Sequence, residues 1–277
     1  GYDGKYRLND LWEYNIDGDY WTQRASLPES AKCNSGVGFS INGKGYITTG
    51  YDGSNYLAAT WEYDPTINEW KSKDDFPKAR YKALAFAIGN YGYVGTGYDG
   101  NYQKDFYRFD PQAAAGQQWE IVNGFGGQKR QGGTSFVIDD KAYICCGVNN
   151  GSYVYDFWCF DPSTGVFTQL RDIADTSDDD YDDDYTSIVR ANAVSFVIDG
   201  KGYLVTGEYG SLLSNYWIYD PATDLWEGED LTAFEGSVRK NAVAFSTGTR
   251  GFVVTGQASS SYYDDTWELS PYEYEEE

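Results

Sequence analysis

Residues 39–70 read FSINGKGYITTGYDGSNYLAATWEYDPTINEW, and residues 196–226 read FVIDGKGYLVTGEYGSLLSNYWIYDPATDLW. Each stretch holds an apolar run, a turn with Gly, and a second apolar run that ends in Thr-Gly. A loop of variable sequence follows, and then a Trp-x-Tyr-Asp-Pro segment and a further Trp. The two stretches therefore repeat one structural unit.

Three landmarks show that this unit recurs along most of the chain. The Gly that ends the second apolar run recurs at Gly50, Gly97, Gly147, Gly207 and Gly256. The Phe of the first run recurs at Phe39, Phe86, Phe136, Phe196 and Phe245. The aromatic residue of the third segment recurs at Trp12, Trp61, Tyr107, Trp158, Trp217 and Trp267. A period of about 50 residues with four short strands per unit is typical of the blades of a β-propeller.

Turn-forming residues separate the strands expected in each unit. Asn-Gly at 42–43 and Asp-Gly at 199–200 lie between two apolar runs and favour tight hairpins. Asp-Pro at 64–65 and 220–221 favours a second turn, because proline presets φ at the start of the turn. Each unit is therefore expected to be a sheet of antiparallel strands.

The repeat resembles that of the kelch-repeat β-propellers, the group that includes the central domain of galactose oxidase. The shared features are the apolar strand, Gly-Lys-Gly-Tyr, the spaced Trp pair, and an ending Thr-Gly where the family more often has Gly-Gly. The resemblance covers nearly the whole chain. It implies an all-β, kelch-type β-propeller, with six blades of four antiparallel strands as the first expectation. Seven blades or a truncated propeller are the alternatives.

The repeats divide the chain into one domain, residues 1–277, with an incomplete first blade. Blades are expected at 28–77, 78–124, 125–177, 188–236 and 237–277, with an acidic insertion at 178–187. Residues 1–27 supply only the second half of a blade. The two strands that it lacks either precede residue 1, or this blade has only two strands.

Composition excludes several classes of function. A net charge of −22 argues against nucleic acid as a partner, because nucleic-acid binding depends on basic surfaces. The absence of His excludes Ser-His-Asp and Cys-His catalysis and His-dependent zinc sites. No apolar run is long enough for a membrane span. The richness in Tyr, Asn, Gly and Asp is similar to that of bacterial extracytoplasmic kelch proteins, which implies an extracytoplasmic or cell-surface location.

Three of the four cysteines fall on two strands expected to be neighbours in one blade. Cys145, Cys146 and Cys159 could form a cross-strand disulfide, or they could be small buried thiols. The sequence favours the thiols.

Arginine recurs six residues before the first-strand Phe, at Arg80, Arg130, Arg190 and Arg239, with Cys33 at the corresponding place in the first full repeat. If these side chains point around one mouth of the ring, they could bind an anionic or polar ligand. Alternatively, each arginine braces its loop by donating to backbone carbonyls of a neighbouring blade.

The loops that follow the second strands are expected at the same end of the ring, the end that carries ligands in many kelch domains. They contain Tyr51 and Asp52, Tyr98 and Asp99, and Tyr209. Asp-Gly suits a turn, whereas exposed Tyr beside Asp and Arg could bind a sugar or a peptide. The predicted ligand-binding residues are Tyr51, Asp52, Arg80, Tyr98, Asp99, Arg130, Arg190, Tyr209 and Arg239.

The acidic insertion is a weak candidate for calcium. Asp179, Asp180, Asp182 and Asp183 offer clustered carboxylates, which hard cations prefer. The segment lacks the Gly and the distal Glu of an EF-hand loop, and a solvated loop is the simpler interpretation. No other cofactor is expected.

These features favour a non-catalytic recognition module that binds a glycan or a protein at the loop end. One alternative is a carbohydrate-active enzyme of the sialidase or sialic-acid-epimerase type, built from the Arg cluster with Tyr and Asp, although the Asp-box repeat of sialidases is absent. Another alternative is a structural subunit of a cell-envelope assembly. The copper chemistry of galactose oxidase is excluded, because its site uses His ligands.

Overall fold

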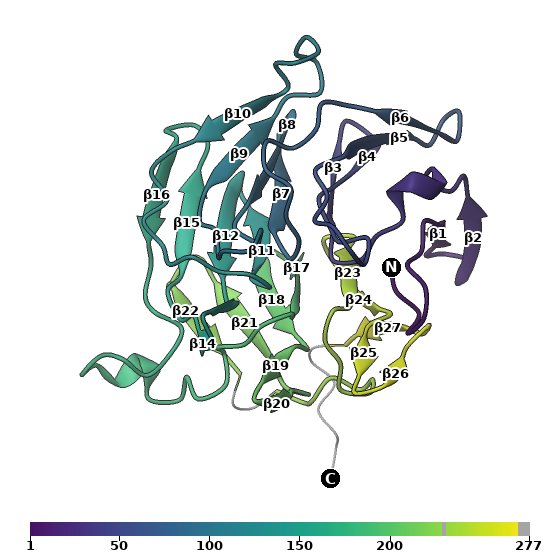
Figure 1. Ribbon diagram of the computed structural model, residues 1–277. Coiled ribbons are helices and arrows are strands. Elements are labelled where there is room, and N and C mark those ends of the chain that lie inside the picture. Colours follow the sequence, from purple (N-terminus) through teal and green to yellow (C-terminus); the bar gives the residue numbers. More distant parts are fainter. Residues whose placement is uncertain (229–230, 271–277) are drawn as a thin grey trace.

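The computed structural model describes residues 1–228 and 231–270, and it consists of β-sheets arranged around a central axis (Figure 1). Four sheets have four strands, one has three, and the first segment forms a two-stranded sheet. Short 3-10 helices occur at Glu29–Ala31 (η1) and Asp180–Asp182 (η2). The prediction of an all-β propeller is confirmed.

The blades follow the sequence order, and each sheet runs from the axis outward. The half blade contains β1 (Leu11–Asn15) and β2 (Tyr20–Arg24). The first blade contains β3 (Val37–Ile41), β4 (Lys44–Thr48), β5 (Thr60–Asp64) and β6 (Glu69–Ser72). The second contains β7 (Leu84–Ile88), β8 (Tyr91–Gly95), β9 (Phe106–Phe109) and β10 (Trp119–Val122). The third contains β11 (Thr134–Ile138), β12 (Lys141–Cys145), β15 (Trp158–Asp161) and β16 (Val166–Gln169).

The fourth blade contains β17 (Val194–Ile198), β18 (Lys201–Val205), β21 (Tyr216–Asp220) and β22 (Leu225–Glu227). The fifth contains β23 (Val243–Ser246), β24 (Gly251–Val254) and β27 (Thr266–Leu269). Two-residue strands form small hairpins in the loops between the second and third blade strands: β13 (Val148–Asn149) with β14 (Ser152–Tyr153), β19 (Glu208–Tyr209) with β20 (Ser211–Leu212), and β25 (Gln257–Ala258) with β26 (Ser261–Tyr262). The fourth strand expected in the blade at 237–277 would follow β27, and residues 271–277 lie outside the described part of the chain.

The turn residues act as their chemistry predicts. Asn42 and Gly43 both adopt positive φ, 51° and 75°, between β3 and β4. Two consecutive residues in this region suit a type I′ hairpin, whose twist matches that of the strands. Asp199 and Gly200 repeat this geometry in the fourth blade, with φ of 49° and 74°.

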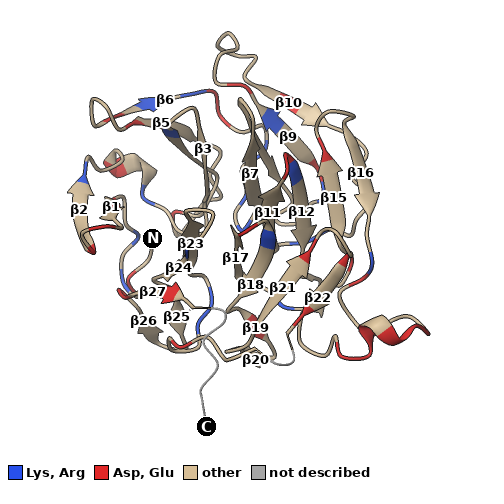
Figure 2. Ribbon diagram, turned by 180° about the vertical axis from the view of Figure 1, so that it is seen from behind, with Lys and Arg blue, Asp and Glu red and all other residues tan. Residues whose placement is uncertain are grey.

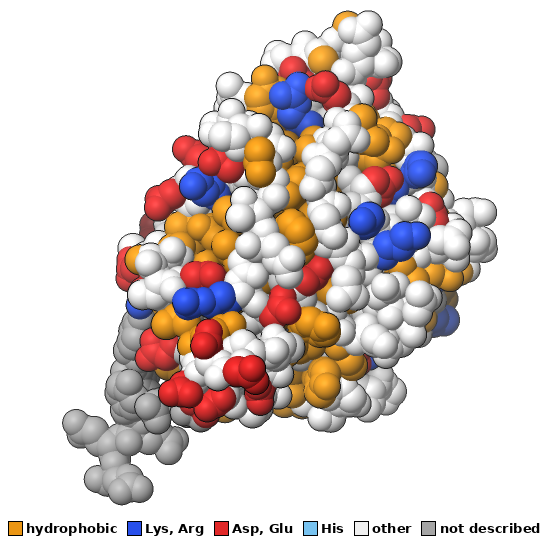
Figure 3. All heavy atoms as spheres, turned by 90° about the vertical axis from the view of Figure 1, so that its left-hand side faces the viewer, with side chains coloured by type: hydrophobic (Ala, Val, Ile, Leu, Met, Phe, Trp, Pro, Cys, Tyr) orange, Lys and Arg blue, Asp and Glu red, His pale blue; other side chains and the backbone are white. Residues whose placement is uncertain are grey.

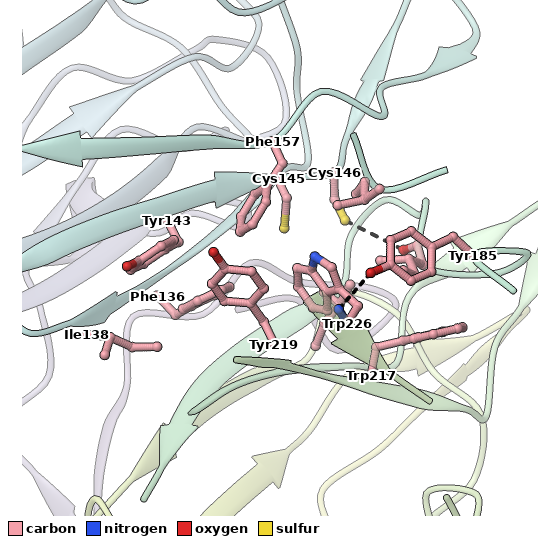
Figure 4. Close-up of a cluster of buried hydrophobic side chains, with 13 residues drawn as sticks. Phe136, Ile138, Tyr143, Cys145, Cys146, Phe157, Tyr185, Trp217, Tyr219 and Trp226 are labelled. Atoms are coloured by element: carbon pink, nitrogen blue, oxygen red, sulfur yellow. Dashed lines mark hydrogen bonds between the residues drawn. The ribbon is translucent and has the colours of Figure 1, made fainter. Parts of the chain in front are cut away.

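Neighbouring blades are joined by apolar side chains that face each other across the interface. Between the third and fourth blades, Phe136, Phe157, Tyr219 and Trp226 are all buried in one cluster (Figure 4). Phe157 meets Tyr219 edge-on at 4.8 Å between ring centroids. Such aromatic pairs add stability beyond the area they bury. The core of the protein therefore lies between the blades.

The surface carries charges of both signs. Acidic residues are distributed over the turns and are concentrated on the insertion that contains η2 (Figure 2). On the side shown in Figure 3, acidic, basic and apolar side chains are intermixed. In the part of the chain that the structure describes, no helix has the length and apolar character needed to span a membrane.

Candidate binding surface at the loop end

The four repeated arginines are completely buried and fully engaged within their own blades. Each donates to the carbonyl two residues before it and to the carbonyl sixteen residues after it, next to the Gly that ends the second strand. Each also reaches a side chain two positions before the third-strand aromatic residue: Asp105 from Arg80, Asp156 from Arg130, Asn215 from Arg190 and Asp265 from Arg239. Their relative exposure is 0% in every case.

This placement corrects the expectation that the arginines line a ligand site. A buried guanidinium needs several acceptors because it has lost its hydration, and these loops supply a carboxylate or amide and two or more carbonyls. The arginines therefore brace the loop between the second and third strands of their own blade, rather than a neighbouring blade. Arg190 faces Asn215 instead of a carboxylate, and burial lowers the pKa of Arg190 to about 10.

The first full blade shows what happens where this brace is missing. Cys33 replaces the arginine, and Ala59 stands where the other blades have the acidic or amide partner. Both residues line a small cavity of about 40 Å³. Trp61 Nε1 is buried there without a hydrogen-bond partner among the described residues, whereas the equivalent Trp158 and Trp267 donate to the aspartates of their braces. The two replacements thus remove both members of one buried pair.

The aspartates of the Tyr-Asp-Gly loops hold turns. Asp52 accepts from the backbone N–H groups of Ser54 and Asn55, both at 2.7 Å, and these bonds lower the pKa of Asp52. Asp99 accepts from the Asn101 N–H at 3.0 Å and from the Gln103 side chain at 2.8 Å. Asp52 and Asp99 therefore follow the turn chemistry that their sequence already favoured.

Five tyrosines gather at the loop end of the first and second blades: Tyr51, Tyr56, Tyr81, Tyr98 and Tyr102. Tyr56 stacks on Tyr81 with ring centroids 5.3 Å apart, and Tyr102 meets Tyr98 at 5.1 Å. All five are partly exposed, so we call them the tyrosine cluster. The Tyr51 hydroxyl donates to the Gly53 carbonyl at 2.7 Å, which fixes that ring over its own turn. The structure thus brings together the predicted Tyr51 and Tyr98 with three tyrosines that sequence reasoning did not select.

A polar network, which we call the axial network, joins the inner ends of three blades. Lys82 Nζ donates to Asn192 Oδ1 at 3.0 Å. Asn192 in turn donates to Glu208 at 2.8 Å, and Lys240 donates to the other oxygen of Glu208 at 2.7 Å. Burial lowers the pKa of Lys82, while Glu208 acts in the opposite direction. The network adjoins the tyrosine cluster, since Lys82 follows Tyr81 in the chain.

Tyr209 is placed apart from the tyrosine cluster. It is 51% exposed, and its ring packs on Tyr153 at 4.6 Å between centroids. The Tyr153 hydroxyl accepts from the Gly210 N–H at 2.9 Å. Tyr209 is therefore available to solvent at the loop end of the third and fourth blades.

The acidic insertion brings together a different set of aspartates from the predicted one. Carboxylate oxygens of Asp175, Asp182 and Asp183 lie within 4.8 Å of one another, whereas Asp179 and Asp180 are not part of this group. Asp182 is buried and accepts from the N–H groups of Thr176 and Ser177, each at 3.0 Å, which lowers its pKa. Asp182 thus closes the insertion as a loop.

Comparisons with known proteins agree with the propeller fold. Residues 129–172 match the model of the kelch motif. The solved structure of YjhT superposes with a TM-score of 0.75 at 14% identity, covering 94% of this chain and 87% of that one. The search of curated proteins found no match. The chain therefore has the fold of a β-propeller and carries a kelch motif in its third full blade.

The cysteines of this propeller are all free thiols, and a disulfide among Cys145, Cys146 and Cys159 is not formed. Cys145 and Cys146 are completely buried in the interface between the third and fourth blades (Figure 4). The interpretation as small buried thiols agrees with the structure for Cys145 and Cys146, whereas Cys159 is a free thiol that is only partly buried.

Sequence reasoning missed the residues of the axial network. Lys82 and Asn192 lie two residues after the arginine position of their blades, and Lys240 lies one residue after it. Glu208 follows the Gly that ends the second strand, at the position of Tyr51 and Tyr98. All four residues lie within two positions of a landmark of the repeat, either the arginine or the Gly that ends the second strand. This closeness was the signal that could have identified them.

Proposed function

We propose that this propeller is a non-catalytic recognition module, and that it binds a glycan through the tyrosine cluster and the adjoining axial network. A protein ligand at the same surface is the second possibility. The observation that carries the proposal is the meeting of five partly exposed tyrosines with the Lys82–Asn192–Glu208–Lys240 network at one end of the ring. A kelch propeller is commonly a binding module, which supports this general class of function.

The chemistry of the surface suits a sugar. Tyrosine rings stack on the apolar face of a pyranose, and their hydroxyls bind its oxygens. Glu208 and Asn192 offer acceptors for sugar hydroxyls, while Lys82 and Lys240 offer donors, including to a carboxylate on the ligand. The buried arginines take no part, because their donors are occupied inside the blades.

A glycan array with the purified chain tests the proposal. Binding should decrease in Lys82→Met, which removes the charge but keeps most of the side-chain volume, and in Tyr102→Ala. Tyr20→Ala is the matched control, because Tyr20 is exposed at the start of β2, beside the β1–β2 turn. A blank array, or equal loss in the control, would refute glycan binding at this surface and turn the search to protein partners.

A sialidase or epimerase site would require a carboxylate within hydrogen-bond reach of a tyrosine in an Arg-lined pocket. Tyr14, Tyr46 and Tyr219 are described residues that donate to carboxylates, at 2.6, 2.9 and 3.0 Å. Their acceptors Asp19, Glu62 and Asp224 are not partners of the buried arginines. We therefore do not propose catalysis.

The proposal extends to the location of the protein and to the number of blades in its ring. We place the protein outside the cytoplasm or at the cell surface, with six blades in the closed ring and no required cofactor. Running the array with calcium and then with a chelator tests whether the acidic insertion contributes. Capture of envelope proteins through the blade sides, unaffected by Lys82→Met, would instead favour a structural subunit of an assembly.

A further inference from the structure

Two adjacent cysteines, Cys145 and Cys146, are completely buried where β12 ends. The Cys145 thiol donates to the Cys146 sulfur, and the Cys146 thiol donates to the Ile188 carbonyl at 3.8 Å (Figure 4). The other blades have Thr48-Thr49, Gly95-Thr96, Val205-Thr206 and Val254-Thr255 at this place. Among these five blades, only the third therefore carries a pair of thiols here.

The sulfur of Cys146 lies beside the arginine of the following blade. The Gly147 N–H donates to the Arg190 carbonyl at 2.8 Å, and the backbone N–H of Arg190 donates to the Cys146 sulfur. The side chains of Cys146 and Arg190 also share an acceptor, because Arg190 Nε donates to the Ile188 carbonyl at 3.1 Å. Cys146 is therefore next to a completely buried positive charge.

Arg190 differs from the other repeated arginines because its partner is an amide. The other three pair with aspartates of their own loops, namely Asp105, Asp156 and Asp265. The residues that face those three from the preceding blade are Thr49, Thr96 and Thr206, whose hydroxyls do not ionise. Arg190 has Asn215 instead of an aspartate, and it is faced by Cys146, whose thiol can ionise. A buried guanidinium is best balanced by an anion, and a thiolate at Cys146 supplies one.

The two thiols of the pair ionise with different ease. Burial raises the pKa of the Cys146 thiol, but the hydrogen bond from Cys145 and the charge of Arg190 outweigh burial and leave that pKa below its ordinary value. The hydrogen bond to Cys146 raises the pKa of the Cys145 thiol, and burial raises it further. Because the thiolate is the reactive form of cysteine, Cys146 is the nucleophile of the pair.

We propose that Cys145 and Cys146 form a dithiol that hydrogen peroxide oxidises, with Cys146 as the attacking residue and Cys145 as the resolving residue. The Cys146 thiolate attacks one peroxide oxygen and breaks the O–O bond, which gives a sulfenic acid and, after protonation, one water. The Cys145 sulfur then attacks the Cys146 sulfur and displaces the sulfenic oxygen as a second water. Two thiols lose two electrons and two protons, and one peroxide becomes two waters.

The surroundings of the pair restrict both the oxidant and the lifetime of the product. Tyr185, Trp217 and Trp226 pack in the same buried cluster, so only a small oxidant reaches the sulfurs through local opening of the interface (Figure 4). Adjacent Cα atoms are about 3.8 Å apart, whereas disulfides usually join Cα atoms about 4.4–6.8 Å apart. A disulfide between neighbours is therefore reduced easily, and the modification is reversible.

Mass spectrometry of the native chain after treatment with hydrogen peroxide tests this assignment. Chymotrypsin cuts after Tyr143 and Tyr153, so residues 144–153 contain the dithiol without Cys159. The disulfide removes two hydrogens from this peptide and protects it from alkylation. Cys33 is the internal comparison, because it is also buried and burial raises its pKa. We expect the dithiol to be oxidised at least about tenfold faster than Cys33, since one pKa unit changes the thiolate fraction about tenfold.

Serine variants separate the roles of the two cysteines. Cys145→Ser keeps a hydrogen-bond donor beside Cys146 but cannot form the disulfide, so peroxide should leave a sulfenic acid at Cys146 that dimedone traps. Cys146→Ser should leave Cys145 unreacted over the same time, because burial keeps its thiol protonated. Circular dichroism verifies that both variants fold.

Asn215→Asp tests the role of Arg190. The change gives Arg190 the carboxylate that the other three arginines have, so the pKa of Cys146 should rise and oxidation of residues 144–153 should slow about tenfold. Asn150→Asp adds the same charge in the exposed turn between β13 and β14 and is the control. In the original chain the oxidation rate should rise with pH, with a midpoint below the pKa of about 8.5 of a free thiol.

Each outcome decides one part of the proposal. Fast formation of the disulfide in the original chain and slow formation in Asn215→Asp would support it. Oxidation of residues 144–153 that is no faster than that of Cys33 would overturn the dithiol. A sulfinic acid at Cys146 beside a free Cys145 thiol would overturn the resolving role. Equal rates in Asn215→Asp and Asn150→Asp would overturn the pairing of Cys146 with Arg190.

Discussion

Removing the carboxylate of Asp156 should strongly destabilise the third blade. Arg130 is completely buried, and without Asp156 its guanidinium keeps only the carbonyls of Gln128 and Cys146, at 3.1 and 3.3 Å. Asp156 also accepts from the Gln128 N–H at 2.7 Å and from Trp158 Nε1 at 3.1 Å. Breaking a buried ion pair from one side costs about 3–5 kcal/mol, so Asp156→Ala should lower the free energy of unfolding by that amount. The melting temperature should fall on the order of 10 °C.

Two further variants show whether the buried charge is responsible. Asp156→Asn reproduces the arrangement of Arg190 with Asn215 in the fourth blade and should cost only about 1–2 kcal/mol. Glu120→Ala removes an exposed partner of Arg108, and such surface pairs are worth about 1 kcal/mol or less. Urea denaturation gives each value from the midpoint at an unchanged slope. If Asp156→Ala cost no more than Glu120→Ala, the arginine would not be a brace, and the account of the four loops would be refuted.

Two other predictions concern the fifth blade and the interface of the first two blades. Hydrogen bonds from Arg239 lower the pKa of Asp265, so this carboxylate stabilises the fold above its unfolded pKa of about 3.9, and the contribution is lost as pH falls through the lower folded value. Asp265→Asn should therefore have a lower melting temperature than the original chain at pH 7, and this difference in melting temperature should shrink towards pH 2. A difference that stays constant with pH would contradict the ion pair. Gly92→Ala should lower the free energy of unfolding by about 1–3 kcal/mol, because the added Cβ would overlap the Phe39 ring. Gly45→Ala is the control and should be nearly neutral in the same urea denaturation experiment, because no ring lies against Gly45. Equal losses in the two variants would show that ring packing does not select glycine at these positions.

The fold could be predicted from the sequence because it depends on local and periodic signals. The Asn-Gly and Asp-Gly turns fix hairpins between adjacent strands, and a regular period brings equivalent residues to equivalent places. The sequence alone marks Trp61 and Trp217 as one repeated position, and the structure places both in the third strand of a blade.

The site could be predicted only in part, because its geometry depends on contacts between positions that were not compared. The arginine position and the aspartate two residues before the third-strand aromatic vary together: Arg80 has Asp105, whereas Cys33 has Ala59. A comparison of these two positions across the repeats would have predicted that each arginine pairs with a residue of its own blade and does not face a ligand. The bond between Lys82 and Asn192 joins residues 110 positions apart and exists only because the ring brings three blades to one axis.

Backbone hydrogen bonds also join neighbouring blades near the axis, from the Lys82 N–H to the Ser35 carbonyl, from Gly132 to Lys82, from Asn192 to Gly132 and from Asn241 to Asn192. This row has a consequence for how the protein can change. The residues in the row share a left-handed backbone, with φ of 55° at Ser35, 50° at Lys82, 64° at Gly132, 56° at Asn192 and 55° at Asn241. Their main chains carry the connection between blades, and only Lys82 and Asn192 of the five are described above as using their side chains in the axial network as well. Four different residue types already occupy them. Single substitutions at these places can thus change the side chains presented near the axis, while the backbone bonds between the blades stay the same.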